Sequence, residues 1–297
     1  MPPVPRRGRA AGARRAVRVP ASRVAPFCGP RHPRLARAAA KRSKGGGVKH
    51  AVALVVLLLW ASAGCSGTNG PLRLDVAAAA DLARALPALA PQLEQNCGVK
   101  LVITFGSSGQ LAQQIEAGAP FAVFFSAQER YVDPLVKAGR TVPDGVRLYA
   151  LGRLAIVTRE GLPPVRSLAE LAQRGDLRRI SIANPAHAPY GEAALQALES
   201  AGVVEAVRPR LVYGENVRQA YEYVERGDAD AGIVAAPLLE RLDDAVLVPS
   251  ELHQPIRQTA AVLRGEHEDA GRCVVHEVLT PAGQALLQSF GFEPISP

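Results

Sequence analysis

The sequence predicts an α/β fold, and the pattern of residues after Gly70 carries that prediction. Short runs of β-branched and aliphatic residues alternate with segments whose apolar residues recur every three or four positions, as in amphipathic helices. Alternating strands and helices are typical of layered α/β domains with mainly parallel sheets. About 227 residues follow Gly70, which is enough for one large domain or two small ones.

Nine strands are expected, in an order that places a helix after most of them. They are Leu72–Ala77, Val99–Phe105, Ala122–Ser126, Arg153–Thr158, Ile180–Ala183, Arg210–Tyr213, Ala231–Ala235, Val246–Val248 and Thr259–Leu263.

Four apolar stripes mark helices between these strands. They are formed by Leu82, Leu86, Leu89 and Leu93, by Leu111 and Ile115, by Ala194, Leu195 and Leu198, and by Val217, Tyr221 and Val224. Such stripes normally face a core. Pro87 and Pro91 fall inside the first helix, where each removes a backbone hydrogen bond. A kink or an early end is therefore expected there, or else two short helices.

The formal net charge of +8 is unevenly distributed along the chain. Residues 1–64 contain 14 of the 35 basic residues and no Asp or Glu, so residues 65–297 keep 21 basic against 27 acidic residues. A domain that holds double-stranded nucleic acid through its phosphates normally carries a basic footprint. The acidic body therefore argues against nucleic acid as a partner.

An export signal is expected at residues 48–65, within VKHAVALVVLLLWASAGCSG. A cationic start at Lys49 precedes a short apolar core and small residues that end at Cys65. The apolar run is shorter than the roughly 20 residues that a membrane-spanning helix needs. The small residues before Cys65 resemble a bacterial lipoprotein signal, in which that cysteine is lipidated. Ser62 stands where Leu, Val or Ile is usual, so ordinary cleavage near Gly67 is the alternative.

Residues 1–47 are rich in Arg, Pro, Ala and Gly and have no apolar period from which a core could form. Because an export signal normally begins the chain, we expect translation to start at Val48 and residues 1–47 to be a gene-model artefact. A long, basic, disordered leader is the alternative. Peptides from residues 1–47 in the precursor would contradict the first interpretation.

Two of the four cysteines, Cys97 and Cys273, belong to the body of the protein. An exported location permits a disulfide, but a wide separation in sequence gives no sign of proximity in the fold. Two buried thiols are therefore favoured over a bridge. No C-x-x-C pair or Cys/His cluster indicates a metal site.

The segment FGSSGQLAQQIEAGAPF, residues 105–121, predicts a strand that turns sharply into an amphipathic helix. The first backbone N–H groups of a helix lack intrahelical partners and carry partial positive charge, so a small oxyanion can bind there without Lys or Arg. Ser107 and Ser108 would add hydroxyl donors. A serine at this place more often only caps the helix, and that is the alternative for each of them.

Three other strand-to-helix junctions have similar chemistry. They are VAAAADLARAL (76–86), ANPAHAPYGEAAL (183–195) and YGENVRQAYEYV (213–224). Each alone resembles any α/β loop. Because open α/β sheets bind ligands at the carboxyl ends of their strands, the four junctions together predict several helix N-termini that converge on one small anion.

Catalytic functions find less support in the sequence. Ser108 could form a triad with His187 or His253 and an Asp, but GSSG does not match the G-x-S-x-G nucleophile elbow. The P-loop and the G-x-G-x-x-G fingerprint are both missing, so nucleotide chemistry lacks its usual parts. No enzymatic activity is expected.

Taken in order, these segments resemble the periplasmic molybdate-binding proteins of ABC transporters. The specific part is GSSGQLAQQIEAGAPF followed by FFSA. The junctions named above, LGRLAIV (151–157) and the closing SFGF (289–292) support it, and the resemblance covers nearly all of residues 71–297.

The resemblance implies a two-lobed type 2 periplasmic-binding-protein fold, in which each lobe is a mixed sheet flanked by helices and the ligand cleft lies between the lobes. Lobe one would comprise residues 71–151 plus 252–297, and lobe two residues 152–251. The chain would cross between them near Leu151–Gly152 and near Pro249–Gln254.

The resemblance also implies the function: capture of molybdate or tungstate outside the cytoplasmic membrane and delivery to the permease subunits of an ABC importer. No resident cofactor is implied. Ser108, Tyr190 and Val217 would hold the molybdate oxygens by hydrogen bonds, with Ala80 and Ser107 in the same site. The protein would be a monomer in the periplasm or on the outer face of the membrane, anchored there if Cys65 is lipidated.

Three positions depart from the family pattern. Ala80 stands where many members have serine, Ala235 where some have an aromatic residue, and Ala122 where an acidic residue is usual. These changes bear on the identity of the ligand more than on the fold. The alternatives are a binding protein for another small oxyanion or organic acid and, from a different class, an exported serine hydrolase.

Overall fold

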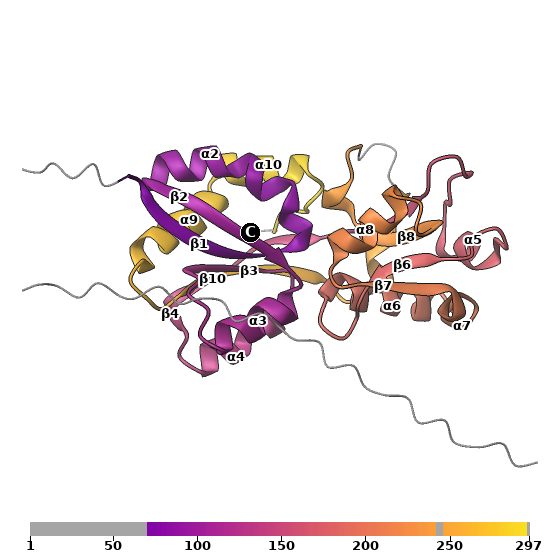
Figure 1. Cartoon of the computed structure of the whole chain (residues 1–297), viewed down its shortest axis with the longest axis horizontal. Coiled ribbons are helices and arrows are strands. Elements are labelled where there is room, and N and C mark those ends of the chain that lie inside the picture. The colour runs from indigo at the N-terminus through magenta and orange to yellow at the C-terminus, as the bar shows by residue number, and fades with distance from the viewer. Residues whose placement is uncertain (1–69, 242–245, 296–297) are drawn as a thin grey trace, which may run out of the picture. The chain divides into compact units, whose positions relative to one another are not determined.

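The computed structural model describes residues 70–241 and 246–295, which belong to one compact unit, Gly67–Pro297. The described chain forms two five-stranded sheets, each flanked by helices (Figure 1). The expected leader (1–47), the export signal (48–65) and Cys65 lie outside the described residues. In the described part, no helix is both long enough and apolar enough to cross a membrane.

The first sheet has the order β2-β1-β3-β10-β4. Its strands are β1 (Leu72–Ala79), β2 (Val99–Gly106), β3 (Val123–Ser126), β4 (Thr141–Gly152) and β10 (Ile256–Leu263). β1 runs parallel to β2 and β3, whereas β10 runs antiparallel to β3 and β4. The sheet is therefore mixed, and the carboxyl ends of its three parallel strands share one edge.

Helices cover both faces of this sheet (Figure 1). On one face lie α2 (Ala85–Cys97), α9 (Glu268–Leu279) and α10 (Pro281–Ser289), and on the other lie α3 (Ser108–Glu116) and α4 (Asp133–Lys137). Short 3₁₀ turns, η1 (Ala80–Ala83) and η2 (Glu129–Tyr131), follow β1 and precede α4. The predicted stripe of Leu82, Leu86, Leu89 and Leu93 is buried against the core between α2, α9 and the sheet.

One expectation about this lobe was wrong, and another was wrong in part. Cys97 and Cys273 form a disulfide with a Cα–Cα distance of 5.7 Å, because the chain returns in α9 to pack beside α2, which sequence separation does not reveal. The early end of the first helix is not observed either, since α2 runs through Pro91 to Cys97. Pro87 lies in its first turn, where a backbone N–H has no intrahelical partner to lose.

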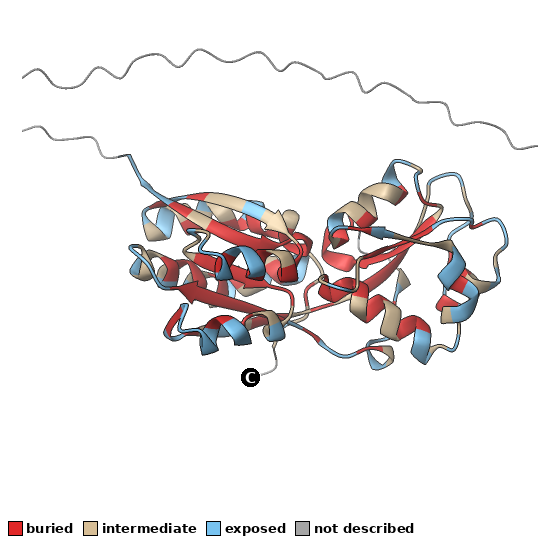
Figure 2. Ribbon diagram, turned by 60° about the horizontal axis from the view of Figure 1, so that its bottom comes forward, coloured by how far each residue is buried: buried red, intermediate tan, exposed pale blue. Residues whose placement is uncertain are grey.

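The second sheet has the order β7-β6-β8-β5-β9. Its strands are β5 (Leu154–Thr158), β6 (Ile180–Ala183), β7 (Leu211–Gly214), β8 (Ala231–Ala235) and β9 (Val246–Leu247). β6 is parallel to β7 and β8, whereas β5 is antiparallel to β8 and β9. The flanking elements are α5 (Leu168–Gln173), α6 (Pro189–Ser200), α7 (Val204–Val207), α8 (Val217–Glu225), η3 (Arg208–Arg210), η4 (Ala236–Leu238) and η5 (Ser250–Leu252). This sheet too is mixed. Its three inner strands, β6, β8 and β5, are mainly buried, whereas the edge strands β7 and β9 are partly exposed (Figure 2).

The chain passes between the two sheets twice. It leaves the first sheet at Gly152 and enters the second at Leu154, and it leaves β9 at Leu247 and returns at Ile256. Ile256 pairs with Gly152 across β10 and β4, so the two crossings lie together. The architecture is the two-lobed α/β fold that the sequence predicted, and the lobe boundaries given above stay predictions.

β4 is the strand that was not predicted from the sequence. It contains Pro143 and Gly145, and Asp144 between them has φ of 53°, a backbone conformation that disrupts regular pairing. The register between β4 and β10 shifts at this point. The alternation of apolar and polar residues is broken there, which removed the pattern that identifies a strand.

Candidate functional site

A small cavity lies where the carboxyl ends of strands from both sheets meet helix N-termini. Its volume is about 10 Å³, room for about one water molecule. The residues that line it are Ala79, Ala80, Asp81, Gly106, Ser107, Ser108, Ala127, Ala188, Pro189, Tyr190, Asn216 and Val217. Five of these residues were predicted from the sequence to belong to the ligand site: Ala80, Ser107, Ser108, Tyr190 and Val217. The structure thus brings all five to one place, and their binding of an oxyanion stays a prediction.

The turn between β2 and α3 gives its two serines different roles. Ser107 is the N-cap of α3, and its hydroxyl oxygen accepts a hydrogen bond from the Gln110 amide at 3.4 Å. Ser108 is the first residue of the helix and is fully buried. Its Oγ accepts a hydrogen bond from the Ala127 amide at 3.0 Å. With its oxygen fixed in this way, the Ser108 hydroxyl retains a proton to donate at the cavity wall.

Two helices of the second lobe begin at the same cavity. Asn216 caps α8 by accepting a hydrogen bond from the Gln219 amide at 3.1 Å, which makes Val217 the first helical residue. The N–H of a first helical residue has no partner within its own helix, so it can serve a ligand. Tyr190 lies in the first turn of α6, directly after Pro189, and its side chain is 1 % exposed.

A buried polar network connects Tyr190 to the first lobe. The Gln258 Nε2 group donates to Asp81 Oδ2 at 2.7 Å and to the Tyr190 hydroxyl at 3.2 Å. The Tyr149 hydroxyl donates to Gln258 Oε1 at 3.0 Å, which fixes the orientation of the amide. Burial raises the pKa of Tyr149 and of Tyr190 well above 10, so both phenols stay protonated near neutral pH. Because Gln258 donates to the Tyr190 oxygen, the tyrosine proton is left to donate, and the Asp81 carboxyl is the acceptor beside it in the ligand-free protein.

Gly152, at the crossover, makes room for this network. A Cβ atom at this position would lie 2.3 Å from the Tyr190 hydroxyl oxygen and 2.8 Å from Gln258 Nε2. Real Cβ contacts are essentially never that close, so a side chain here would displace both groups. The last residue of β4 must therefore be glycine for packing.

Asp81 is one of the seven lining residues that the sequence did not predict for the site, and the one among them with an ionisable side chain. It is fully buried, and its Oδ1 atom has no hydrogen-bond partner. Burial raises the pKa of Asp81 to about 6, although hydrogen bonds from Tyr190, Gln258 and the backbone act in the opposite direction. Asp81 belongs to the junction VAAAADLARAL that the sequence analysis identified. Its contact with Gln258 could not be predicted, because it forms only when β10 returns to the first sheet.

Several contacts join the two lobes beside the cavity. The Gly109 amide donates to the His187 carbonyl oxygen at 2.9 Å, and Ser107 Oγ shares a hydrogen bond with His187 Nδ1 at 2.8 Å. Gln110 Nε2 donates to Glu215 Oε2 at 2.8 Å. The helix N-terminus of α3 is thus partly engaged by the second lobe, and these contacts close the cavity from that side.

These contacts bear on the possibility of a serine hydrolase. The imidazole lies beside Ser107 and not beside Ser108, whose hydroxyl binds the Ala127 amide. His187 Nε2 is 3.8 Å from Glu215 Oε2, beyond hydrogen-bond distance. The structure therefore does not assemble the triad around Ser108 that the sequence left open.

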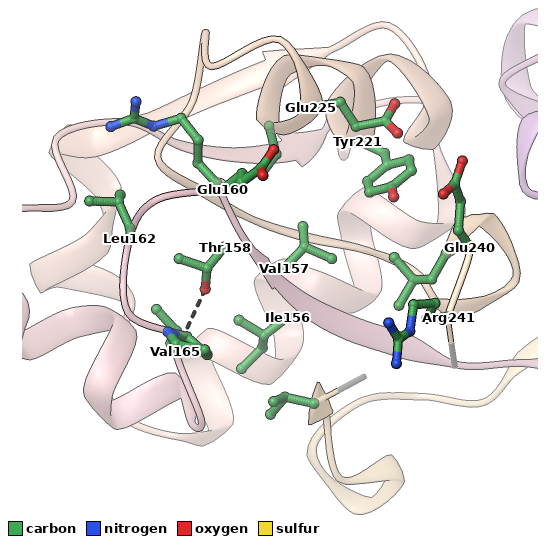
Figure 3. A pocket seen from close by; sticks show the side chains of 15 residues that line it. Ile156, Val157, Thr158, Glu160, Leu162, Val165, Tyr221, Glu225, Glu240 and Arg241 are labelled. Carbon is green, nitrogen blue, oxygen red and sulfur yellow. Dashed lines mark hydrogen bonds between the residues drawn. The ribbon is translucent and has the colours of Figure 1, made fainter. Parts of the chain in front are cut away.

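A second and much larger hollow, of about 530 Å³, lies on the second lobe (Figure 3). Its wall includes apolar residues such as Ile156, Val157 and Val165, and Thr158 Oγ1 accepts a hydrogen bond from the Val165 amide at 2.9 Å. The charged groups around it are Glu160, Glu225, Glu240, Arg159 and Arg241, and Arg159 pairs with Asp230. This excess of carboxylates disfavours an anion, so the hollow does not compete with the small cavity as an oxyanion site.

No arrangement suited to a bare metal ion is present in residues 70–241 and 246–295. No three His, Cys, Asp or Glu side chains there form a group that could hold one. The chemistry that the small cavity offers is hydrogen-bond donation, from the Ser108 and Tyr190 hydroxyls and from backbone N–H groups.

The chain is similar to known solute-binding proteins. Residues 74–293 match the family model described as "Bacterial extracellular solute-binding protein". The molybdate-binding protein ModA of Azotobacter vinelandii is 33 % identical over 228 residues, which cover 74 % of this chain and 89 % of that protein. ModA of Rhodobacter capsulatus is 34 % identical over 201 residues, covering 67 % and 79 %.

A solved structure gives the same relationship in three dimensions. The periplasmic molybdate-binding protein of Azotobacter vinelandii superposes with a TM-score of 0.69 at 30 % sequence identity. The match covers 75 % of this chain and 99 % of that one. The similarity therefore extends over the whole of the related protein.

Proposed function

Because the chain belongs to the bacterial extracellular solute-binding protein family, we propose that it binds molybdate or tungstate and delivers it to the membrane subunits of an ABC importer. The observation that carries the proposal is the cavity shared by both lobes. Its wall combines the Ser108 hydroxyl, the Tyr190 hydroxyl and the first-turn amide of Val217. Proteins of this family bind and transport solutes, and we assign the chain a binding role without catalysis.

The energetics of such a site are sufficient for tight binding. A hydrogen bond to a charged acceptor contributes about 1.5–3 kcal/mol, and micromolar affinity corresponds to about 8 kcal/mol. About six donors would supply about 9–18 kcal/mol, which exceeds that requirement before the entropic cost of association is counted. The lining residues include no Lys or Arg, so the donors are uncharged and selection among dianions rests on the size of the closed cavity.

Binding requires the lobes to move. A cavity of about 10 Å³ is too small for a tetrahedral oxyanion, and the contacts of His187 with Ser107 and Gly109 close its side. We infer that the lobes separate about the two crossings near Gly152 and Ile256 to admit the anion, and close again around it.

The location and partners follow from the same role. We propose that the mature protein acts in the periplasm or at the outer face of the cytoplasmic membrane, as a monomer, with Cys65 as the lipid anchor if the signal is processed as in lipoproteins. Its partners would be the permease subunits and the small oxyanion, and nucleic acid would have no part.

Calorimetry of the purified protein with molybdate, tungstate, sulfate and phosphate tests the proposal. Tight binding of molybdate and tungstate with much weaker binding of sulfate and phosphate is expected. Sulfate binding as tight as that of molybdate, or no binding of any of the four anions, would defeat it.

Two alternatives carry specific observations. Ala80 and Ala235 replace a serine and an aromatic residue that relatives of this kind often have, which favours a different small oxyanion or an organic acid. The Ser107–His187 hydrogen bond of 2.8 Å favours, more weakly, an exported hydrolase. Ester hydrolysis that disappears in Ser107→Ala would support that second alternative.

A further inference from the structure

The Asp81 carboxyl group is the least expected feature of a site for an anion. It lies in the cavity wall, it is fully buried, and one of its two oxygens has no hydrogen-bond partner. A buried polar atom without a partner is rare in folded proteins because its lost hydration is not replaced. Within residues 70–241 and 246–295 no donor forms a hydrogen bond of regular geometry with this oxygen, so it can serve a bound ligand.

The groups that face Asp81 come from three elements in addition to its own. Tyr149 comes from β4, Tyr190 from α6 and Gln258 from β10, and none of them carries a charge near neutral pH. No Lys, Arg or His contributes to the pKa of Asp81. A carboxylate here would have no cation to offset its charge.

A fully ionised oxyanion cannot bind well beside such a carboxylate. Two like charges in a poorly hydrated cavity repel strongly, and both would present only hydrogen-bond acceptors to each other. A neutral carboxylic acid removes both problems, since it has no charge and its O–H group is a donor. The arrangement resembles buried carboxyls that are kept neutral in order to donate a hydrogen bond.

We propose that Asp81 is itself a ligand-binding residue of this site and holds the oxyanion as a neutral carboxylic acid that donates a hydrogen bond to an anion oxygen. It would supply the donor that its neighbour Ala80, with no hydroxyl, cannot. This inference rests on the proposed function. It adds Asp81 to the residues that bind the anion, and it adds the uptake of one proton to the binding reaction.

The proton balance follows directly. Burial raises the pKa of Asp81 to about 6, so the group is mostly ionised in the ligand-free protein at pH 7.5, about 1.5 pH units higher. Binding of a dianion raises this pKa further, and one proton from the solvent then joins the carboxylate as the anion enters. Affinity for a fully ionised anion should fall up to about tenfold for each pH unit above the pKa of the ligand-free protein.

The same carboxyl distinguishes two classes of oxyanion. Molybdate, tungstate and sulfate have no O–H group near neutral pH, so they need the protonated carboxyl. Hydrogen phosphate carries its own proton and can donate it to the ionised carboxylate, so its binding needs no proton from the solvent. Proton uptake is therefore a signature of the first class.

Calorimetry of the wild-type protein with molybdate, in two buffers of different ionisation enthalpy at about pH 7.5, measures that proton directly. Uptake approaching one proton per anion is expected. Asp81→Asn keeps the shape and offers an N–H donor in every protonation state. It should bind molybdate with no uptake and with an affinity that no longer depends on pH between about pH 6.5 and pH 8.5.

The neighbouring Asp75→Asn is the matched control, since its carboxyl is 35 % exposed and pairs with Arg73 on the same strand. It should retain the proton uptake of the wild type. Asp81→Ala, which offers no donor, should bind molybdate more weakly than Asp81→Asn.

The outcomes separate this inference from the proposed function. Molybdate binding without proton uptake by the wild type would overturn the role of Asp81 and leave the proposed function standing, as would uptake that persists in Asp81→Asn. Binding of phosphate alone, without uptake, would overturn both, and so would binding of none of the anions. The wild-type measurement needs no substitution, so the test survives a variant that fails to fold.

Discussion

The small cavity between the lobes and the large hollow on the second lobe differ in size, charge and access, and the small cavity has the features of a ligand site. The large hollow, about 530 Å³, is open and surrounded by exposed carboxylates of the second lobe. The small cavity, about 10 Å³, is closed by both lobes and lined by buried hydroxyls and helix N-termini. A site for a small anion is therefore identified by converging donors and not by volume.

The difference also lies in what each cavity does to its ionisable groups. In the small cavity burial raises the pKa of Asp81 to about 6. At the large hollow burial raises the pKa of Tyr221 to about 12, helped by Glu225 and Glu240, so this phenol stays neutral and its titration lies far from neutral pH. Of these two groups, Asp81 in the small cavity is the one whose pKa lies near the physiological range.

The largest expected effect is on the pH dependence of stability. The pKa of Asp81 is about 6 in the folded protein and about 3.9 when unfolded. Its contribution to stability is thus complete below about pH 4 and is lost as the pH rises through 6, a loss of up to about 3 kcal/mol. Asp81→Asn should remove this loss and unfold at higher urea concentration than the wild type near pH 7.5, measured without oxyanion.

Glu225→Gln, at the rim of the large hollow, is the comparison for that experiment. Because Glu225 is exposed, this variant should show the same pH dependence of stability as the wild type. If Asp81→Asn and the wild type lose stability in parallel between about pH 4 and pH 7, the carboxyl is not the buried, ionising group described here.

Next in size is the loss of one hydroxyl from each cavity. Ser108 and Thr158 make matched contacts, since each oxygen accepts a backbone amide, at 3.0 Å and 2.9 Å. Ser108→Ala should weaken molybdate binding by about 1.5–3 kcal/mol, because a donor to a charged acceptor is lost. Thr158→Val should leave it unchanged. Equal affinities of both variants in calorimetry would make Ser108 a purely structural residue.

The sequence predicted the α/β class because the alternation of strands and helices shows in the local periodicity of apolar residues. The resemblance to the family implied the two lobes. Nine strands were expected where the structure has them, with ends that differ by a few residues. β4 was missed because Pro143 and the turn at Asp144 interrupt its alternation. The disulfide was not favoured because its two cysteines are 176 residues apart and meet only through the packing of α9 on α2.

The site was predictable to the extent that it consists of strand-to-helix junctions. The resemblance to the family implied Ser108, Tyr190 and Val217 in particular. All three stand at helix starts and line the cavity. The partners of Tyr190 were not predictable, because Gln258 meets Asp81 across 177 residues of sequence through the pairing of β10 with β4. A long-range hydrogen bond of this kind leaves no local pattern.

A smaller effect is expected from a methyl group placed between the lobes. A Cβ at Gly109 would lie 2.8 Å from the His187 carbonyl oxygen, so Gly109→Ala should hinder closure and weaken molybdate binding about tenfold. Alanine is the better helix former by up to about 1 kcal/mol, so the stability of the protein should not fall.

Gly175→Ala is the matched control, because nothing lies within 4 Å of its added Cβ. Both variants would be compared by calorimetry and by thermal unfolding. A Gly109→Ala protein with wild-type affinity would show that this contact does not limit the closed state.

The smallest expected effect is none at all, and it bears most directly on the difference between the cavities. Tyr190 and Tyr221 each bring a neutral phenol to one cavity, the first buried beside Gln258 and the second half-buried beside Glu225. Tyr190→Phe should weaken molybdate binding, whereas Tyr221→Phe should stay within about 0.5 kcal/mol of the wild type, as a substitution outside the site does. A larger loss in Tyr221→Phe than in Tyr190→Phe, measured by calorimetry, would move the site to the large hollow. The convergence of uncharged hydrogen-bond donors would then be the wrong criterion for locating the anion site.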